Sequence, residues 1–67
     1  MQLTVPEKLR GATVLDAHSW VLGKLDGQSE YVLRDVSGNR VTLTDLTRKG
    51  GVNAIQIEAK SARTNPS

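Results

Sequence analysis

Asp16, His18 and Ser19 stand close together in the sequence, and side chains of these types can form a nucleophilic relay. A serine nucleophile needs a base beside it, and a histidine oriented by a carboxylate can act as that base. Here the three residues fall in a predicted turn, where short polar side chains serve turn geometry. We therefore expect no catalytic site at this point and interpret the chain as a non-enzymatic protein.

Other reactive patterns give the same interpretation. Paired carboxylates for acid–base chemistry would have to come from residues at predicted strand ends, where solvated side chains are expected: Asp16, Asp26, Glu30, Asp35 and Asp45. Arg48-Lys49-Gly50-Gly51 has the composition of an anion-binding loop, but it lacks phosphate-loop spacing and opens no predicted helix. A hairpin turn is the favoured interpretation. One histidine and no cysteine exclude a His/Cys zinc site and disulfides, and we expect no metal and no cofactor.

Trp20 and Tyr31 are the only aromatic residues of the chain. Large aromatic side chains dominate the energetics of cores and interfaces. We expect Tyr31 in the core, and we expect Trp20, which follows the predicted turn, to be an exposed anchor. The predicted partner surface is therefore Trp20, Val21 and Lys24.

Positive charge is concentrated in the last third of the sequence, although the formal net charge is only +2. Residues 47–67 hold four cationic side chains against Glu58 alone. Solvated loop charge is the ordinary meaning of such a pattern, and nucleic-acid binding is the alternative. The candidate contacts are Arg40, Arg48, Lys49, Lys60 and Arg63. Because they are scattered, we expect RNA or DNA affinity no better than about 10⁻⁶ M at physiological salt.

The length of 67 residues predicts one domain. We expect a domain over residues 1–59 and a flexible tail over residues 60–67, which is short and polar. A core of this size supplies rarely more than about 3–5 kcal/mol, so a partner protein or self-association is a natural source of further stability. No apolar run reaches the roughly 18 residues of a membrane span, and a cytoplasmic location is the expectation.

Alternation of apolar and polar residues predicts five short strands, at residues 12–16, 20–25, 30–35, 39–45 and 53–59. Pro6 and the residues after it, up to Arg10, predict at most one short helical turn. Ser37-Gly38-Asn39 predicts a hairpin turn between the third and fourth strands. Gly50-Gly51 allows positive φ before the fifth strand.

Five short strands predict an all-β fold, a small and strongly bent five-stranded SH3-like barrel, because closing a sheet removes its exposed edges. Gly23 inside a strand pattern is typical of a sharp bend. The expected core takes one apolar face from each strand: Trp20, Leu22, Tyr31, Leu33, Val41, Leu43, Ile55 and Ile57.

Residues 9–26, "LRGATVLDAHSWVLGKLD", resemble the start of the PRC-barrel family. The resemblance lies in a glycine, a strand valine, an aspartate two residues later and a second strand of hydrophobic-Gly-Lys-hydrophobic type: Gly11, Val14, Asp16, Leu22, Gly23, Lys24 and Leu25. Ser19 departs from it, since the family usually has a turn glycine there. PRC barrels are mostly interaction modules, and one is part of a ribosome-maturation factor, so this resemblance implies a protein-binding β-barrel.

The later strands resemble Sm-like proteins over residues 23–58. Gly23, Tyr31 and the run Asn53-Ala54-Ile55 carry this likeness, and Ser29 departs from it where that family usually has an aspartate. Sm-like rings bind single-stranded RNA. Both resemblances imply a small bent barrel but different functions. We expect a protein-interaction module that can self-associate, with an RNA- or DNA-binding barrel as the alternative.

Overall fold

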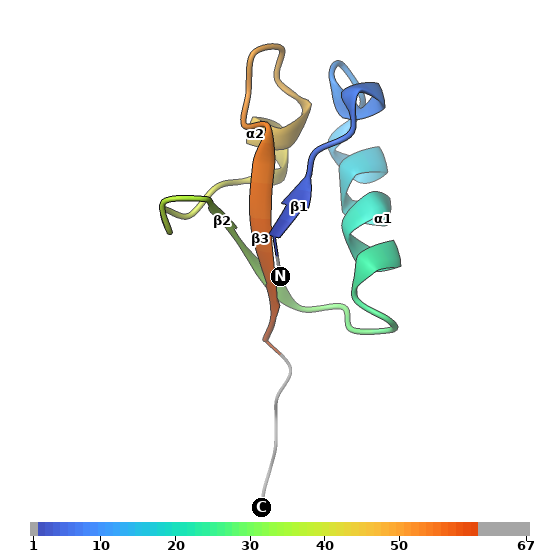
Figure 1. Ribbon diagram of the computed structural model, residues 1–67. Coiled ribbons are helices and arrows are strands. Elements are labelled where there is room, and N and C mark those ends of the chain that lie inside the picture. Colours follow the sequence, from blue (N-terminus) through green and yellow to red (C-terminus); the bar gives the residue numbers. More distant parts are fainter. Residues whose placement is uncertain (1, 61–67) are drawn as a thin grey trace, which may run out of the picture.

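The computed structural model describes residues 2–60, which form a three-stranded antiparallel sheet with two α-helices and one 3₁₀ turn (Figure 1). The elements follow in the order β1 (Gln2–Thr4), η1 (Glu7–Leu9), α1 (Val14–Lys24), β2 (Tyr31–Asp35), α2 (Leu43–Thr47) and β3 (Ala54–Ala59). Lys60 is the last described residue, so the remainder of the expected tail lies outside the described residues.

The last strand in the sequence is the middle strand of the sheet. The strand order is β1-β3-β2, with Leu3 opposite Ile55 in one ladder and Leu33 opposite Ile57 in the other. Strands β1 and β2 are not paired with each other, so the sheet is open. The expected five-stranded all-β SH3-like barrel is therefore wrong, and the fold is mixed α/β.

Helix α1 replaces the two strands that we expected at residues 12–16 and 20–25. Thr13 caps its N-terminus, because its hydroxyl accepts a hydrogen bond from the backbone N–H of Asp16 at 3.0 Å. Ala17, Val21 and Leu25 are buried at a spacing of four residues, which is the period of a helix rather than of a strand. Gly23 lies inside the helix and marks no bend of a barrel.

Helix α2 replaces the second half of the strand that we expected at residues 39–45. Thr42 and Asp45 form a capping box, in which each side chain accepts a hydrogen bond from the backbone N–H of the other residue. Only Arg40 keeps a strand-like pairing, as an isolated bridge to Arg34. The hairpin turn before it is present, since Asp35 N–H donates to Asn39 O at 2.8 Å.

Three other expectations match the structure in position. Strand β2 lies within the expected 30–35, β3 lies within the expected 53–59, and η1 follows Pro6 as a single turn. The expectation of at most one helical turn is wrong, because α1 and α2 are helices as well. Gly50 has the positive φ, 76°, that the glycine pair was expected to allow. Strand β1 was not expected.

The core lies between the helices and one face of the sheet. Every element except β1 contributes a buried residue, and the segments after β1 and α1 contribute one each. The buried residues are Val5, Leu9, Ala17, Val21, Leu25, Leu33, Leu46, Ile55 and Ile57. Of the expected core, Leu33, Ile55 and Ile57 are buried, and Trp20, Tyr31, Val41 and Leu43 pack against the core while remaining partly exposed. The core thus depends on α1 and η1 more than the strand pattern predicted.

Candidate functional site

A cleft of about 460 Å³ lies between η1 and α1, and Trp20 lines it. Leu9 and Ala12 contribute apolar surface from the η1 side, and Lys8 stands beside them. Helix α1 contributes Asp16, Ser19 and Trp20, which share one side of the helix because they are three or four residues apart. We call this the Trp20 cleft.

The indole of Trp20 is partly buried, and Lys24 lies over it with Nζ 5.8 Å from the ring centre. This is the distance of a cation–π contact. Trp20 and Lys24, two of the three residues of the predicted partner surface, therefore lie together on α1. Val21 is fully buried and belongs to the core, so it cannot contact a partner in this fold.

Apolar side chains are also exposed at the N-terminal end of α1. Val14 is 46% exposed and Leu15 is 71% exposed, and they stand one turn before His18 and Ser19. Leu15 is thus the most exposed large apolar side chain among the described residues. An exposed leucine alone needs no explanation, but it adds apolar area to the helix that lines the Trp20 cleft.

Asp16, His18 and Ser19 do not converge. Asp16 and Ser19 line the Trp20 cleft, whereas His18 faces β2, where its Nδ1 lies 2.6 Å from the hydroxyl of Tyr31. Burial raises the pKa of Tyr31, so the phenol keeps its proton and can donate it to the histidine nitrogen. The pair joins α1 to β2 and leaves the serine without a base.

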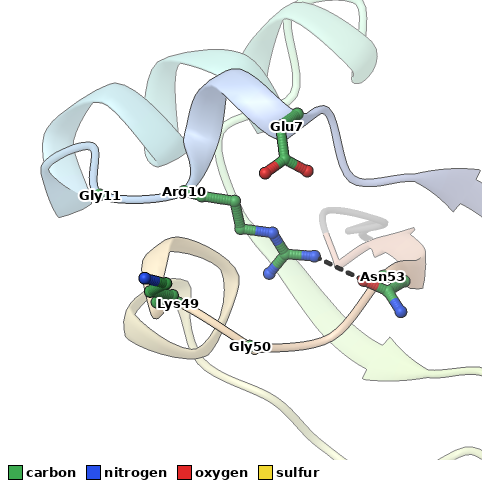
Figure 2. Close-up of a pocket in the computed structure, with 6 residues that line it drawn as sticks. All are labelled: Glu7, Arg10, Gly11, Lys49, Gly50 and Asn53. Carbon is green, nitrogen blue, oxygen red and sulfur yellow. Dashed lines mark hydrogen bonds between the residues drawn. The ribbon is translucent and has the colours of Figure 1, made fainter.

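A second cavity, also of about 460 Å³, lies between the turn after η1 and the α2–β3 loop (Figure 2). Figure 2 shows Glu7, Arg10 and Gly11 on one side of it and Lys49, Gly50 and Asn53 on the other. We call it the Arg10 pocket. Its two walls are nearly 40 residues apart in the sequence, so no local pattern could have revealed it.

Arg10 holds the α2–β3 loop in place. Its Nη2 donates to Val52 O at 2.6 Å and to Asn53 Oδ1 at 2.8 Å, and its Nη1 lies 3.4 Å from Arg48 O and 3.5 Å from Leu46 O. The Leu46 carbonyl lies in the last turn of α2, and those of Arg48 and Val52 follow it. Backbone acceptors at the end of a helix lack helical partners. A cation is favoured there by the helix dipole as well.

Gly51 allows the close approach on which this loop depends. A Cβ at this position would lie 2.1 Å from Asp45 O and 2.9 Å from Arg48 O, so any side chain would overlap the main chain. The sequence pattern predicted positive φ for the pair Gly50-Gly51. Gly50 has it, whereas Gly51 is needed because a side chain there would overlap neighbouring carbonyl oxygens.

The candidate nucleic-acid contacts are only partly brought together. Arg48 and Lys49 lie in the α2–β3 loop, near Arg10. Lys60 follows β3, and six strand residues separate it from that loop by about 20 Å. Arg40 forms a bridge to Arg34 of β2, which is the edge strand opposite β1. Arg63 lies outside the described residues.

Two of the cationic side chains already form ion pairs. Arg48 pairs with Asp45 at 3.3 Å, and Arg34 pairs with Glu58 at 3.6 Å. Among residues 2–60, no group of three or more His, Cys, Asp or Glu side chains could hold a metal ion. Within the same range, no helix has the length and hydropathy to cross a membrane.

Comparisons with protein-family models, with curated proteins and with solved structures find no match to this chain. The resemblances to PRC-barrel and Sm-like proteins therefore stay predictions made from the residues. The class that the structure itself defines is a small mixed α/β domain with an open antiparallel sheet, a cleft at Trp20 and a second cavity at Arg10.

Proposed function

We propose that this chain is a non-enzymatic protein-interaction module that binds its partner through the Trp20 cleft. The observation that carries the proposal is the position of the only tryptophan of the sequence, partly exposed at a cleft that has both apolar and charged lining residues. Tryptophan is among the residues that contribute most to binding energy at interfaces. The partner presents an apolar side chain to Ala12 and Trp20.

Charge on the two walls of the cleft adds a basis for specificity. Lys8 stands on the η1 side and Asp16 on the α1 side. Polar groups around an apolar centre are the usual arrangement of an interface. A partner segment with an acidic residue on one side of its apolar anchor and a basic residue on the other complements both walls. We place this interaction in the cytoplasm, in keeping with a chain that has no cysteine.

The partner can be a second copy of the chain. Leu15 and Val14 are exposed on α1 and are apolar enough to enter such a cleft on another copy. Sedimentation equilibrium at rising protein concentration checks this form of the proposal. A molecular mass that stays at 7.3 kDa throughout would leave a different protein as the partner.

A blocked cleft is the direct test. A random peptide library is selected on the wild-type chain and on Ser19→Arg, which fills the cleft with a long side chain on an exposed helical position. Ser29→Arg is the matched control, because it makes the same change at an exposed residue of the α1–β2 loop that does not line the cleft. We expect peptides that bind the wild type and Ser29→Arg and that lose binding to Ser19→Arg.

Tryptophan emission supplies the second readout, since every signal comes from Trp20. A selected peptide that enters the cleft should shift the emission to shorter wavelength as it excludes water from the ring. Peptides that bind Ser19→Arg equally well, or that leave the emission unchanged, would place the binding surface elsewhere.

RNA or DNA binding is the second candidate function, and the cations near the α2–β3 loop favour it: Lys8, Arg10, Arg48 and Lys49 come from two neighbouring segments. It ranks lower because base stacking has no aromatic residue at this place. Trp20 lies under Lys24, and the Tyr31 hydroxyl is bonded to His18. Salt dependence of single-stranded RNA binding tests it, with a slope of about −0.7 per phosphate contact. Tight, salt-steep binding would reverse the ranking.

A further inference from the structure

The Arg10 pocket brings a fixed positive charge to a cavity that the proposed function does not use. The guanidinium of Arg10 is held by four backbone or amide oxygens, the nearest at 2.6 Å. Neither of the two ion pairs found among residues 2–60 includes Arg10. Its hydrogen-bond partners are therefore neutral oxygens, and these hold the guanidinium in place before an anion arrives.

Lys49 and Asn53 add hydrogen-bond donors to the same cavity. Lys49 is exposed and carries three N–H donors on a flexible stem. Asn53 uses Oδ1 as the acceptor for Arg10 at 2.8 Å, which settles the orientation of its amide. What Asn53 has left to offer a ligand is its NH₂ group, which Figure 2 shows directed away from the guanidinium.

Two glycines leave the cavity walls open. Gly11 has φ 85° and Gly50 has φ 76°, and an added Cβ at either position would meet no heavy atom within 4 Å. A ligand can therefore approach the main chain at both walls. Glycine serves this purpose wherever a backbone must lie close to a bound group.

Glu7 opposes an anion, because its carboxylate lines the same cavity (Figure 2). Two cations and one carboxylate leave a net positive charge, so an anion is favoured but only moderately. This repulsion is useful for the test. Removal of the Glu7 carboxylate should strengthen anion binding, an effect that the loss of a favourable contact could not produce.

We propose that the Arg10 pocket binds a phosphate-type oxyanion, with Lys49 and Asn53 as donors and Arg10 as the fixed charge. A tetrahedral oxyanion accepts several hydrogen bonds at once. Lys49 and Asn53 stand on either side of Arg10 (Figure 2), and the flexible stem of Lys49 lets its amine turn toward an anion beside the guanidinium. The anion comes either from free phosphate or from a phosphodiester backbone. This site does not depend on the Trp20 cleft, which lies on the other side of η1 and shares none of its lining residues.

Titration with inorganic phosphate, followed by ¹H–¹⁵N spectra at constant ionic strength, tests the site. We expect saturable shifts of the Gly11 and Gly50 amides and of the Asn53 side-chain amide. Lys49→Gln should weaken binding about five-fold and Glu7→Gln should strengthen it by a similar factor, the effect of roughly 1 kcal/mol for one exposed charge. Lys24→Gln is the control, since Lys24 stands over Trp20.

A second arm distinguishes the two sources. A single-stranded oligonucleotide is added at the same concentration of phosphate groups. Displacement of inorganic phosphate from the same amides identifies a phosphodiester as an accepted ligand, and unchanged phosphate binding identifies the free anion. Shifts that do not saturate, that sodium chloride reproduces, or that Glu7→Gln fails to strengthen would overturn the proposal.

Discussion

Helices α1 and α2 differ in length and in the interactions that hold them. Helix α1 has 11 residues and rests on the core through an apolar side with Ala17 and Val21. Helix α2 has five residues, a capping box at its N-terminus, and Arg10 bound to the carbonyls at and beyond its C-terminus. Isolated helices shorter than about 12–15 residues are marginal in water, so α2 needs its end groups satisfied by other parts of the chain.

The difference teaches where each helix is sensitive. Substitution should damage α2 through the polar and backbone atoms around it, although Leu46 also anchors it in the core. The exposed side of α1 should accept large changes, since capping and packing of its other side are sufficient. The following changes test this contrast, from the largest expected effect to the smallest.

Gly51→Ala should have the largest effect. The added methyl group would meet Asp45 O at 2.1 Å, and severe overlap with the main chain costs on the order of 4 kcal/mol. A domain of this size has about 3–5 kcal/mol in total, so the variant should be largely unfolded. Circular dichroism and urea denaturation measure this. A variant that keeps the wild-type midpoint would show that the loop relaxes without cost.

Arg10→Met should reduce the free energy of unfolding by about 2 kcal/mol, because hydrogen bonds from a charged group to partly buried acceptors are lost. Methionine keeps much of the apolar stem. Hydrogen exchange should show α2 and residues 48–53 losing protection while α1 keeps it. Equal loss in both helices would mean that Arg10 stabilises the whole domain instead of the α2 end.

Gly23→Ala should increase the free energy of unfolding by about 0.5–1 kcal/mol, since alanine has the higher helix propensity and the position is open. The expected sign is opposite to that of the same substitution at Gly51. Urea denaturation of the two variants side by side measures the contrast. A decrease in stability would mean that the exposed side of α1 is not as tolerant as its surroundings indicate.

Acid should weaken α2 before α1. We expect this effect to be smaller than those of the three substitutions above, because water reaches the carboxylates. The N–H of Thr42, and then its hydroxyl, lowers the pKa of Asp45, and the N–H of Asn39 does the same to the pKa of Asp35. A lowered pKa stabilises the fold above the unfolded value near about 4, and this contribution is lost as the pH falls through the folded pKa. Hydrogen exchange of α2 amides between neutral and acid pH measures it.

Asp45→Asn separates the two carboxylates. The variant should lose the acid dependence of α2 and keep the part that Asp35 contributes in the turn before Asn39. An acid dependence of α2 that persists unchanged in Asp45→Asn would assign it to a group outside the capping box.

The strands that were predicted well carry their signal in their own residues. Ile55 and Ile57 alternate with polar neighbours, and this period continues into the observed β3. Helix α1 was mistaken for strands because Val14, Trp20 and Val21 favour strands by composition. Helix α2 was mistaken for a strand because Val41 and Leu43 alternate with Thr42 and Thr44. The signal that favoured helices was present but sparse, in Thr13 three residues before Asp16 and in Thr42 three residues before Asp45.

The candidate sites could be predicted only in part for a related reason. Trp20 was expected as an anchor because it follows a predicted turn; that turn is part of α1, yet the structure places Trp20 at a cleft. The position of Val21 in the core could not follow from a strand assignment, which turned its side chain outward. The roles of Arg10 and Gly51 depend on contacts between segments far apart in the sequence, and no local pattern reports those.

The strand order has a consequence for how the chain folds as it is made. Strands β1 and β2 both pair with β3, so neither has a partner until residues 54–59 have left the ribosome. Until then, the nascent chain can form only local structure, such as α1 and the turn at Asp35. The sheet then closes in one late step, and a chain cut before Ala54 has no sheet to form.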